Sequence, residues 1–261
     1  MDFDPARPPT TPRDAAAVIL VRPRASDGAP ELFLARRPAK AAFMARAFVF
    51  PGGAREGDED PRATAARELF EEAGVLLADA GPDVARDLRA RGAAGAPLDD
   101  LLAGAGLRLD LERLVPFSHW VTPSAERRRF SARFYVALLP AGQAAEIDGQ
   151  ELVEARWVTA RDALAESDAL HLPPPQLRTV WELRDVANPA DLLALARARA
   201  AHAAPLLPRY APLPGGFALL LPWDPEYATL GTGEAAPLAP GHPLAGGPSR
   251  FVLEGEAWRH V

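Results

Sequence analysis

The sequence contains no cysteine, so it offers no disulfide, no thiolate metal site and no cysteine nucleophile. Basic residues are not in excess either. The net charge of -6 argues against a protein that binds nucleic acid by neutralising many phosphates. No apolar run approaches the roughly 20 residues that span a bilayer, and the first 13 residues are polar, so we expect neither a signal peptide nor a membrane anchor. These absences favour a cytoplasmic protein that binds a small molecule.

The chain has 261 residues, of which 48% are hydrophobic and 25% charged, the balance of a globular protein. We predict a polar leader over 1–13, a domain over 14–160, and a C-terminal segment over 161–261 that packs on the domain. Beyond Pro205 prolines and glycines crowd the chain and leave two strand-like pieces, 217–221 and 250–253. This extension covers either the domain or a neighbouring subunit, so a homodimer is left open.

Strand-like and helix-like segments alternate along the domain. The expected strands are 15–22, 31–36, 47–50, 114–120, 129–139 and 152–158. The expected helices are 61–73, 160–166, 176–186 and 189–203, with a helical insertion over about 79–111. Strands on either side of the first helix favour an α/β fold in which helices cover both faces of a mixed sheet, an α/β/α sandwich.

The helix over 61–73 has defined ends. Asp60 is a suitable N-cap, Pro61 suits the first helical position, and Gly74 suits a left-handed C-terminal cap. An apolar stripe runs along the helix, and we expect it to pack on the sheet. The stripe consists of Ala66, Leu69, Phe70 and Ala73.

Three glutamates, Glu68, Glu71 and Glu72, are spaced i, i+3 and i+4 on the roughly opposite face. Like charges at these offsets destabilise a helix. A divalent cation would compensate, because Mg²⁺ and Mn²⁺ prefer carboxylate oxygens, polarise phosphoryl groups and activate water. The alternative for the three glutamates alone is a solvated acidic face.

The surrounding residues favour the cation. Gly53 is followed by five residues and Glu59, then by seven residues and the run Arg67-Glu68-Leu69-Phe70-Glu71-Glu72-Ala73-Gly74-Val75. This pattern resembles the Nudix box at every defined position and stands in the required strand-loop-helix context. The resemblance implies a Nudix-type α/β/α sandwich and a hydrolase that cuts a phosphoanhydride in a nucleoside-diphosphate-linked substrate.

The resemblance also implies roles for individual residues. Glutamates matching Glu68, Glu71 and Glu72 bind the divalent ions in this family, and a backbone carbonyl at Gly52 or Gly53 adds a ligand. The arginine matching Arg67 orients acidic neighbours, and Glu59 belongs to the same group. Gly53 and Gly74 permit backbone conformations that a side chain would obstruct. Glu151, or Glu154 near it, matches the region that supplies a general base or a further ligand, the alternative being an exposed strand edge.

The flanks of the box are similar to the animal organellar coenzyme A diphosphatase branch of the family. The matching segments are 34–38, 43–44, 49–53, 120–123, 129–130 and 133–135. This similarity makes coenzyme A or acyl-coenzyme A the expected substrate. The candidate phosphate-binding residues are Arg36, Arg37, Arg129 and Arg133. Trp120 or Phe130 could stack on a base, or could simply pack in the core, and the run Arg127 to Arg129 could bind an anion or be a solvated surface.

Other functions remain as alternatives. The closest in chemistry is a pyrophosphatase acting on ADP-ribose, NADH or another nucleotide sugar. A regulatory module that binds nucleotides without catalysis would have the same fold, but the box residues are all retained. An isomerase of the isopentenyl diphosphate type relies on a cysteine, which is absent here. An RNA-cap hydrolase is disfavoured by the acidic charge balance.

Overall fold

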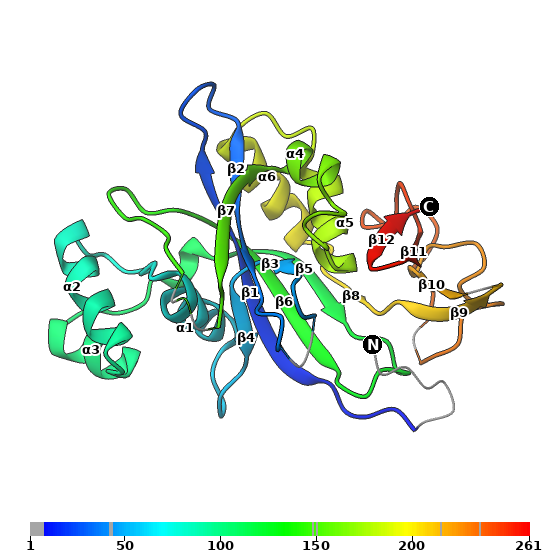
Figure 1. Ribbon diagram of the computed structural model, residues 1–261, viewed down its shortest axis with the longest axis horizontal. Helices are drawn as coiled ribbons and strands as arrows, with labels where there is room; N and C mark the ends of the chain where they lie inside the picture. The colour runs from blue at the N-terminus through cyan, green and yellow to red at the C-terminus, as the bar shows by residue number, and fades with distance from the viewer. Residues whose placement is uncertain (1–7, 42–43, 148, 150, 215, 235) are drawn as a thin grey trace.

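The computed structural model describes residues 8–41, 44–147, 149, 151–214, 216–234 and 236–261. The first seven residues of the expected leader, and Phe43 in the flanks of the box, lie outside the described residues. Within the described chain an eight-stranded mixed sheet forms the centre, with the order β3-β2-β1-β6-β5-β8, β4 pairing with β1 and β7 pairing with β2 (Figure 1). The strands are β1 (Arg13–Pro23), β2 (Pro30–Arg36), β3 (Phe48–Val49), β4 (Gly52–Ala54), β5 (Val115–Val121), β6 (Phe130–Leu138), β7 (Glu154–Thr159) and β8 (Pro205–Leu206).

Strand β1 lies in the middle of the sheet, parallel to β6 and antiparallel to β2. Its apolar run is buried on both faces, as expected for a strand next to a parallel partner. Ile19 and Val21 belong to one core cluster and Val18 and Leu20 to another, since alternate side chains point to opposite faces. The central strand therefore joins the two halves of the core.

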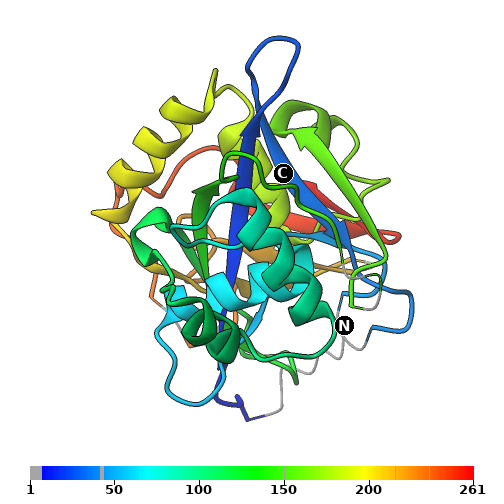
Figure 2. The ribbon, with the colours of Figure 1, turned by 90° about the vertical axis from the view of Figure 1, so that its left-hand side faces the viewer.

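Helices cover both faces, so the mixed sheet with helices on either side confirms the expected architecture (Figures 1 and 2). On one side lie α1 (Pro61–Ala73), the insertion helices α2 (Pro82–Ala93) and α3 (Leu98–Ala105), and a short 3₁₀ turn, Leu111–Arg113. On the other side lie α4 (Ala160–Ala165), α5 (Pro174–Leu183) and α6 (Pro189–Ala200). Within the described residues no helix combines the length and apolarity needed to cross a membrane.

One part of the packing prediction for α1 is wrong. Leu69 packs with the sheet, but Phe70 packs in a separate cluster with Leu88 and Leu101 of the insertion. The stripe is split because the insertion folds against the edge of α1 and needs an apolar partner of its own. Within the insertion, Val84 is exposed.

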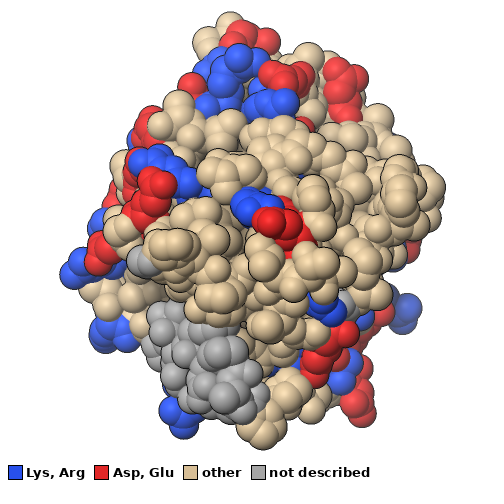
Figure 3. All heavy atoms as spheres, turned by 90° about the vertical axis from the view of Figure 1, so that its right-hand side faces the viewer, with Lys and Arg blue, Asp and Glu red and all other residues tan. Residues whose placement is uncertain are grey.

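The C-terminal extension forms a second, four-stranded antiparallel sheet in the order β12-β11-β10-β9. Its strands are β9 (Arg209–Leu213), β10 (Gly216–Leu220), β11 (Arg250–Glu254) and β12 (Ala257–His260). Leu219 and Phe251 share a core cluster with Trp120 of β5, so the two sheets are packed together. On the face in Figure 3, charged side chains gather near the edges and the middle is mostly uncharged.

Candidate active site

Helix α1 begins and ends as the sequence predicts. The Asp60 carboxylate accepts a hydrogen bond from the Arg62 N–H at 2.8 Å, and Pro61 occupies the first turn. Gly74 ends the helix in the left-handed conformation, with φ 65°. These caps fix where the helix starts and stops, and so fix which residues of the box face the loop that precedes it.

Arg67 gathers the acidic residues on one side of α1. Its guanidinium donates to Glu59 at 2.9 Å, to Glu68 at 3.0 Å and to Glu71 at 2.9 Å. A fourth bond, 3.2 Å long, goes to the Ala54 carbonyl of β4. The planar guanidinium can serve several oxygens at once and therefore holds the carboxylates in place.

Glu72 is buried, with 6% of its surface exposed, although the sequence placed it on the polar face. Its carboxylate accepts a hydrogen bond from the Gly52 N–H at 2.7 Å. Burial raises the pKa of Glu72 to about 8; the Gly52 hydrogen bond opposes this shift, Glu68 adds to it and Arg37 opposes it. The nearby positive charge of Arg37 thus favours the ionised carboxylate.

Glu68 lies beneath the Gly52-Gly53 turn. A Cβ built on Gly53 would lie 2.4 Å from a Glu68 carboxylate oxygen, so any larger residue there would have to push this carboxylate aside. Burial raises the pKa of Glu68 to about 7, with Arg67 opposing the shift. The backbone of β4 is therefore in close contact with two carboxylates from neighbouring turns of α1.

Glu71 and Glu151 lie on the solvent side of Glu68 and Glu72, and with Glu59 these residues form the acidic group of the site. Half of the Glu71 side chain is exposed (50%). Glu151 is exposed in the loop before β7, and its charge helps to raise the pKa values of Glu68, Glu71 and Glu72. The structure thus brings Glu151 into electrostatic range of all three helix glutamates.

These groups suit a hard divalent cation. Oxygen donors of high negative charge density are the ligands that Mg²⁺ and Mn²⁺ prefer, and burial of neighbouring carboxylates creates a need for positive charge. Among the described residues no three Asp, Glu or His side chains form a ready-made cation cage. Such a cage is not required, because Mg²⁺ keeps several waters and uses one or two carboxylates together with substrate phosphates.

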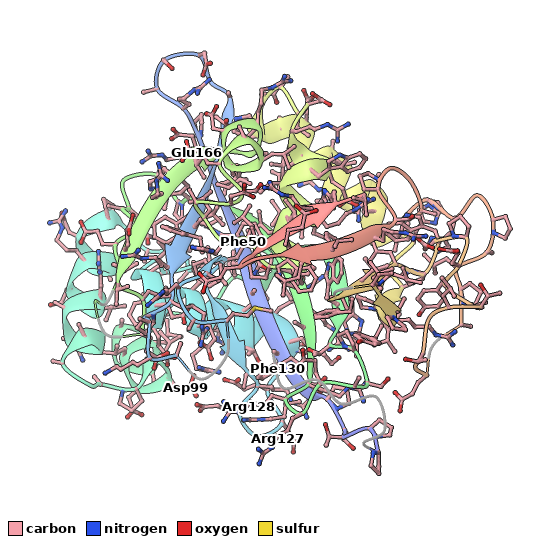
Figure 4. The ribbon with its side chains drawn as sticks, turned by 45° about the vertical axis from the view of Figure 1, so that its right-hand side comes forward. Phe50, Asp99, Arg127, Arg128, Phe130 and Glu166 are labelled. Carbon is pink, nitrogen blue, oxygen red and sulfur yellow. The ribbon has the colours of Figure 1, made fainter. Side chains whose placement is uncertain are left out.

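A cavity of about 330 Å³ adjoins the Gly52-Gly53 turn on the side of the sheet away from α1. Trp120, Phe130 and Phe134 form aromatic walls, and Arg37 also lines the cavity. Figure 4 shows Phe50 and Phe130, both lining residues, along the sheet. The cavity is of a size for part of a nucleotide, and its lining includes Gly52 and Gly53, whose backbone contacts Glu72 and Glu68.

Some cavity residues were not expected from the sequence. They come from the start of α5 and the C-terminal extension, and they include Pro174, Pro175, Gln176, Pro208 and Leu219. No local pattern marks these residues, because they reach the cavity only through the packing of the extension on the domain.

Of the four arginines expected to bind phosphate, only Arg37 lines this cavity; Arg36, Arg129 and Arg133 do not. Arg36 pairs with Glu154 at 3.0 Å, and Arg133 pairs with Asp14 at 3.6 Å. These ion pairs lie in partly exposed positions on β2, β7, β1 and β6. The structure therefore brings Arg37 together with the box and leaves Arg36 and Arg133 in pairs outside the cavity.

Arg129 is engaged inside the protein. Its side chain is 2% exposed and donates to the Thr10 carbonyl at 2.6 Å, the Thr122 carbonyl at 3.1 Å and Glu234 at 3.3 Å. Through these hydrogen bonds Arg129 links the N-terminal leader, the end of β5 and the C-terminal extension. The charge pattern suggested an anion site, but hydrogen bonds to carbonyls distant in sequence cannot be seen in such a pattern.

Arg127 and Arg128 line a second cavity, of about 770 Å³, that shares Met44 and Glu126 with the first (Figure 4). Arg46, His171, Glu256 and Trp258 also line it. Among the described non-glycine residues, Met44, Arg46 and His171 have positive φ, at 50°, 65° and 45°, and all three belong to this second cavity. Strained backbone of this kind concentrates at ligand-binding sites.

Comparison with known proteins agrees with the box. Residues 11–92 match the family model described as NUDIX domain. A Caenorhabditis elegans protein provisionally named nudix hydrolase 7 is 31% identical over 189 residues, which cover 67% of this chain and 61% of that protein. The chain thus spans less than two thirds of that relative. A crystal structure of a NUDIX hydrolase from Alicyclobacillus acidocaldarius is 28% identical, with a TM-score of 0.60, over 71% of this chain and 96% of the other.

Proposed function

We propose, from the match of residues 11–92 to the NUDIX domain model, that the chain is a divalent-metal-dependent hydrolase of nucleoside-diphosphate-linked substrates. One observation carries the proposal. The Glu72 and Glu68 carboxylates lie against the Gly52-Gly53 backbone, and these two glycines also line a cavity with aromatic walls. A metal and the diphosphate would meet at the carboxylates, and the nucleoside would extend into the cavity.

Glu68, Glu71 and Glu72 would hold Mg²⁺ or Mn²⁺, together with the Gly53 carbonyl. When bound, such an ion polarises phosphoryl oxygens and makes water a better nucleophile. Arg67 keeps two of the carboxylates and Glu59 in position. Glu151, close to the three glutamates and exposed, would take the proton of the attacking water, and Arg37 would bind a phosphate oxygen.

The finer proposal is that the substrate is coenzyme A or acyl-coenzyme A. This molecule carries a phosphate beyond its diphosphate, and the second cavity supplies Arg46, Arg127 and Arg128 next to the first. Guanidinium groups pair well with such a phosphate. Matched assays with coenzyme A and 3′-dephospho-coenzyme A test this step: Arg128→Gln should raise KM for coenzyme A and leave KM for the dephospho compound nearly unchanged.

Phosphate release, coupled to a phosphatase, from a panel of diphosphates tests the general proposal. The panel contains coenzyme A, acyl-coenzyme A, ADP-ribose, NADH, diadenosine polyphosphates and nucleoside triphosphates, each with Mg²⁺, with Mn²⁺ and with chelator. Turnover of ADP-ribose or NADH in preference to coenzyme A would favour the alternative pyrophosphatase. Tight nucleotide binding without turnover under any metal would favour a non-catalytic regulatory module.

A further inference from the structure

Two residues that line the first cavity each have a buried polar atom without a hydrogen-bond partner in the described structure. These atoms are Nε of Arg37 and Oε1 of Gln176. Buried polar groups in folded proteins are nearly always paired, because an unpaired group has lost its hydration without replacement. Two unpaired polar atoms in residues of the same cavity indicate that a bound ligand supplies their hydrogen-bond partners.

The two atoms would pair with different groups of a ligand. Arg37 is a cation whose charge reaches Glu72, so its end of the cavity suits an anion held beside the carboxylates. The Gln176 amide oxygen can only accept a hydrogen bond, so its partner is an N–H or O–H donor. An anion and an uncharged donor are therefore expected at separate points of one ligand.

Gln176 is held in place by its surroundings. It lies in the first turn of α5, behind Pro174 and Pro175, and only 6% of its surface is exposed. Trp120 and Phe130 line the same cavity. Flat aromatic walls with one hydrogen-bond acceptor suit a planar ring that carries a donor at its edge.

Thr122, another polar residue of the cavity, is already satisfied. Its hydroxyl accepts from the Phe130 N–H at 3.0 Å and donates to the Phe130 carbonyl at 3.4 Å. It is thus engaged with the backbone of β6, whereas the Gln176 oxygen is left for a ligand.

We propose that Gln176 selects the nucleobase of the substrate: its amide oxygen accepts a hydrogen bond from the exocyclic amino group of an adenine-type base held between the aromatic walls. The inference rests on the proposed function, since it takes a nucleoside diphosphate as the bound group. It gives the C-terminal segment, which lies beyond the matched family segment of 11–92, a part in substrate choice.

The test compares ADP with inosine diphosphate, which has a keto oxygen in place of the amino group. Binding is measured by calorimetry with Mg²⁺, so that turnover is not needed. The wild type should bind ADP about five- to tenfold more tightly, the ratio that one hydrogen bond supplies. Gln176→Met, which keeps the volume, should bring ADP to the level of inosine diphosphate, and Gln176→Glu, which keeps an acceptor, should retain the preference for ADP.

Gln143→Met is the matched control, because the Gln143 amide is bonded to the Leu76 backbone outside the cavity. It should leave the ADP preference unchanged. Equal affinity of the wild type for the two nucleotides, no binding of either, or a Gln176→Met variant that weakens both equally would overturn the inference. Failure of the proposed function is seen separately, as absence of metal-dependent phosphate release.

Discussion

The Gly52 N–H donates a 2.7 Å hydrogen bond to the Glu72 carboxylate, and so joins β4 to the last turn of α1 across 20 residues of chain. A Cβ on Gly52 would lie 2.3 Å from the Ala16 carbonyl oxygen of β1. A side chain at this position would therefore collide with β1, beside which β4 lies in the sheet. This hydrogen bond ties the Glu72 carboxylate of α1 to the edge of the sheet.

Replacing Glu72 with glutamine should stabilise the metal-free protein at pH 9. Burial raises the pKa of Glu72 from 4.5 to about 8, so the folded state loses stability as pH rises from 4.5 to 8 and bears the full cost at pH 9, and the amide removes this cost. Glutamine still accepts the Gly52 hydrogen bond. Thermal unfolding in chelator should show a higher Tm for Glu72→Gln than for the wild type, and a lower Tm would contradict the assigned burial cost.

Gly53→Ala should displace the Glu68 carboxylate, since the new Cβ would lie 2.4 Å from its oxygen. We expect turnover to fall at least tenfold, about the effect of 1.4 kcal/mol on a barrier. The control is Gly104→Ala in α3, where a Cβ meets nothing within 4 Å. That variant should keep full activity and gain up to about 1 kcal/mol of stability. Equal activities of Gly53→Ala and Gly104→Ala would contradict the role of Gly53 in positioning Glu68.

Arg67→Gln should lower both stability and metal affinity, because Glu59, Glu68 and Glu71 would lose their shared cation. The side chain is 13% exposed, and we expect a loss of about 2 to 3 kcal/mol on unfolding by urea. Arg86→Gln, which breaks an exposed ion pair with Asp83, should change stability by less than about 1 kcal/mol. A metal titration of activity that is identical in Arg67→Gln and wild type would contradict the role of Arg67.

His260 makes the fold sensitive to acid. Burial lowers the pKa of His260 to about 4, and Arg178 and Arg184 add to the shift. Its Nε2 has no hydrogen-bond partner among the described residues. An unfolded histidine binds a proton near pH 6.5, so the folded state loses stability as pH falls through 6.5 toward 4, by about 2 kcal/mol between pH 8 and pH 5.

His260→Phe should remove this acid sensitivity, since phenylalanine keeps the ring contacts with Phe251 and Trp181 and has no proton to bind. Urea unfolding at pH 8 and pH 5 is the measurement, and His202→Phe at an exposed histidine is the control. If His260→Phe loses as much stability at pH 5 as the wild type, the group responsible lies elsewhere.

The local features of the fold could be read from the sequence. The apolar run of β1, the turn before β2 and the capped ends of α1 depend on neighbouring residues, and the structure has them as expected. Strand β4 was missed because Gly52 and Gly53 disfavour strands, and it forms only by pairing with β1. Strands β9 and β12 were also missed. Each pairs with the neighbouring strand of a short hairpin, β10 and β11 respectively, and the two hairpins form one sheet only because β10 pairs with β11 across a long stretch of chain.

The candidate site divides in the same way. The box glutamates and Arg67 lie within a few turns of one helix, so their spacing predicted their proximity. The burial of Glu72, the internal bonds of Arg129 and the cavity position of Gln176 depend on contacts between distant segments. A run of charges or a single glutamine carries no information about such contacts.

The most direct test of the central claim is the rate of phosphate release from the best diphosphate of the panel, measured as Mg²⁺ or Mn²⁺ is titrated into wild-type protein and Glu72→Gln. We predict saturable, metal-dependent turnover of the wild type, no turnover in chelator, and a rate at least roughly 100-fold lower for the variant. Turnover that persists in chelator, or a Glu72→Gln rate equal to that of the wild type, would contradict the account.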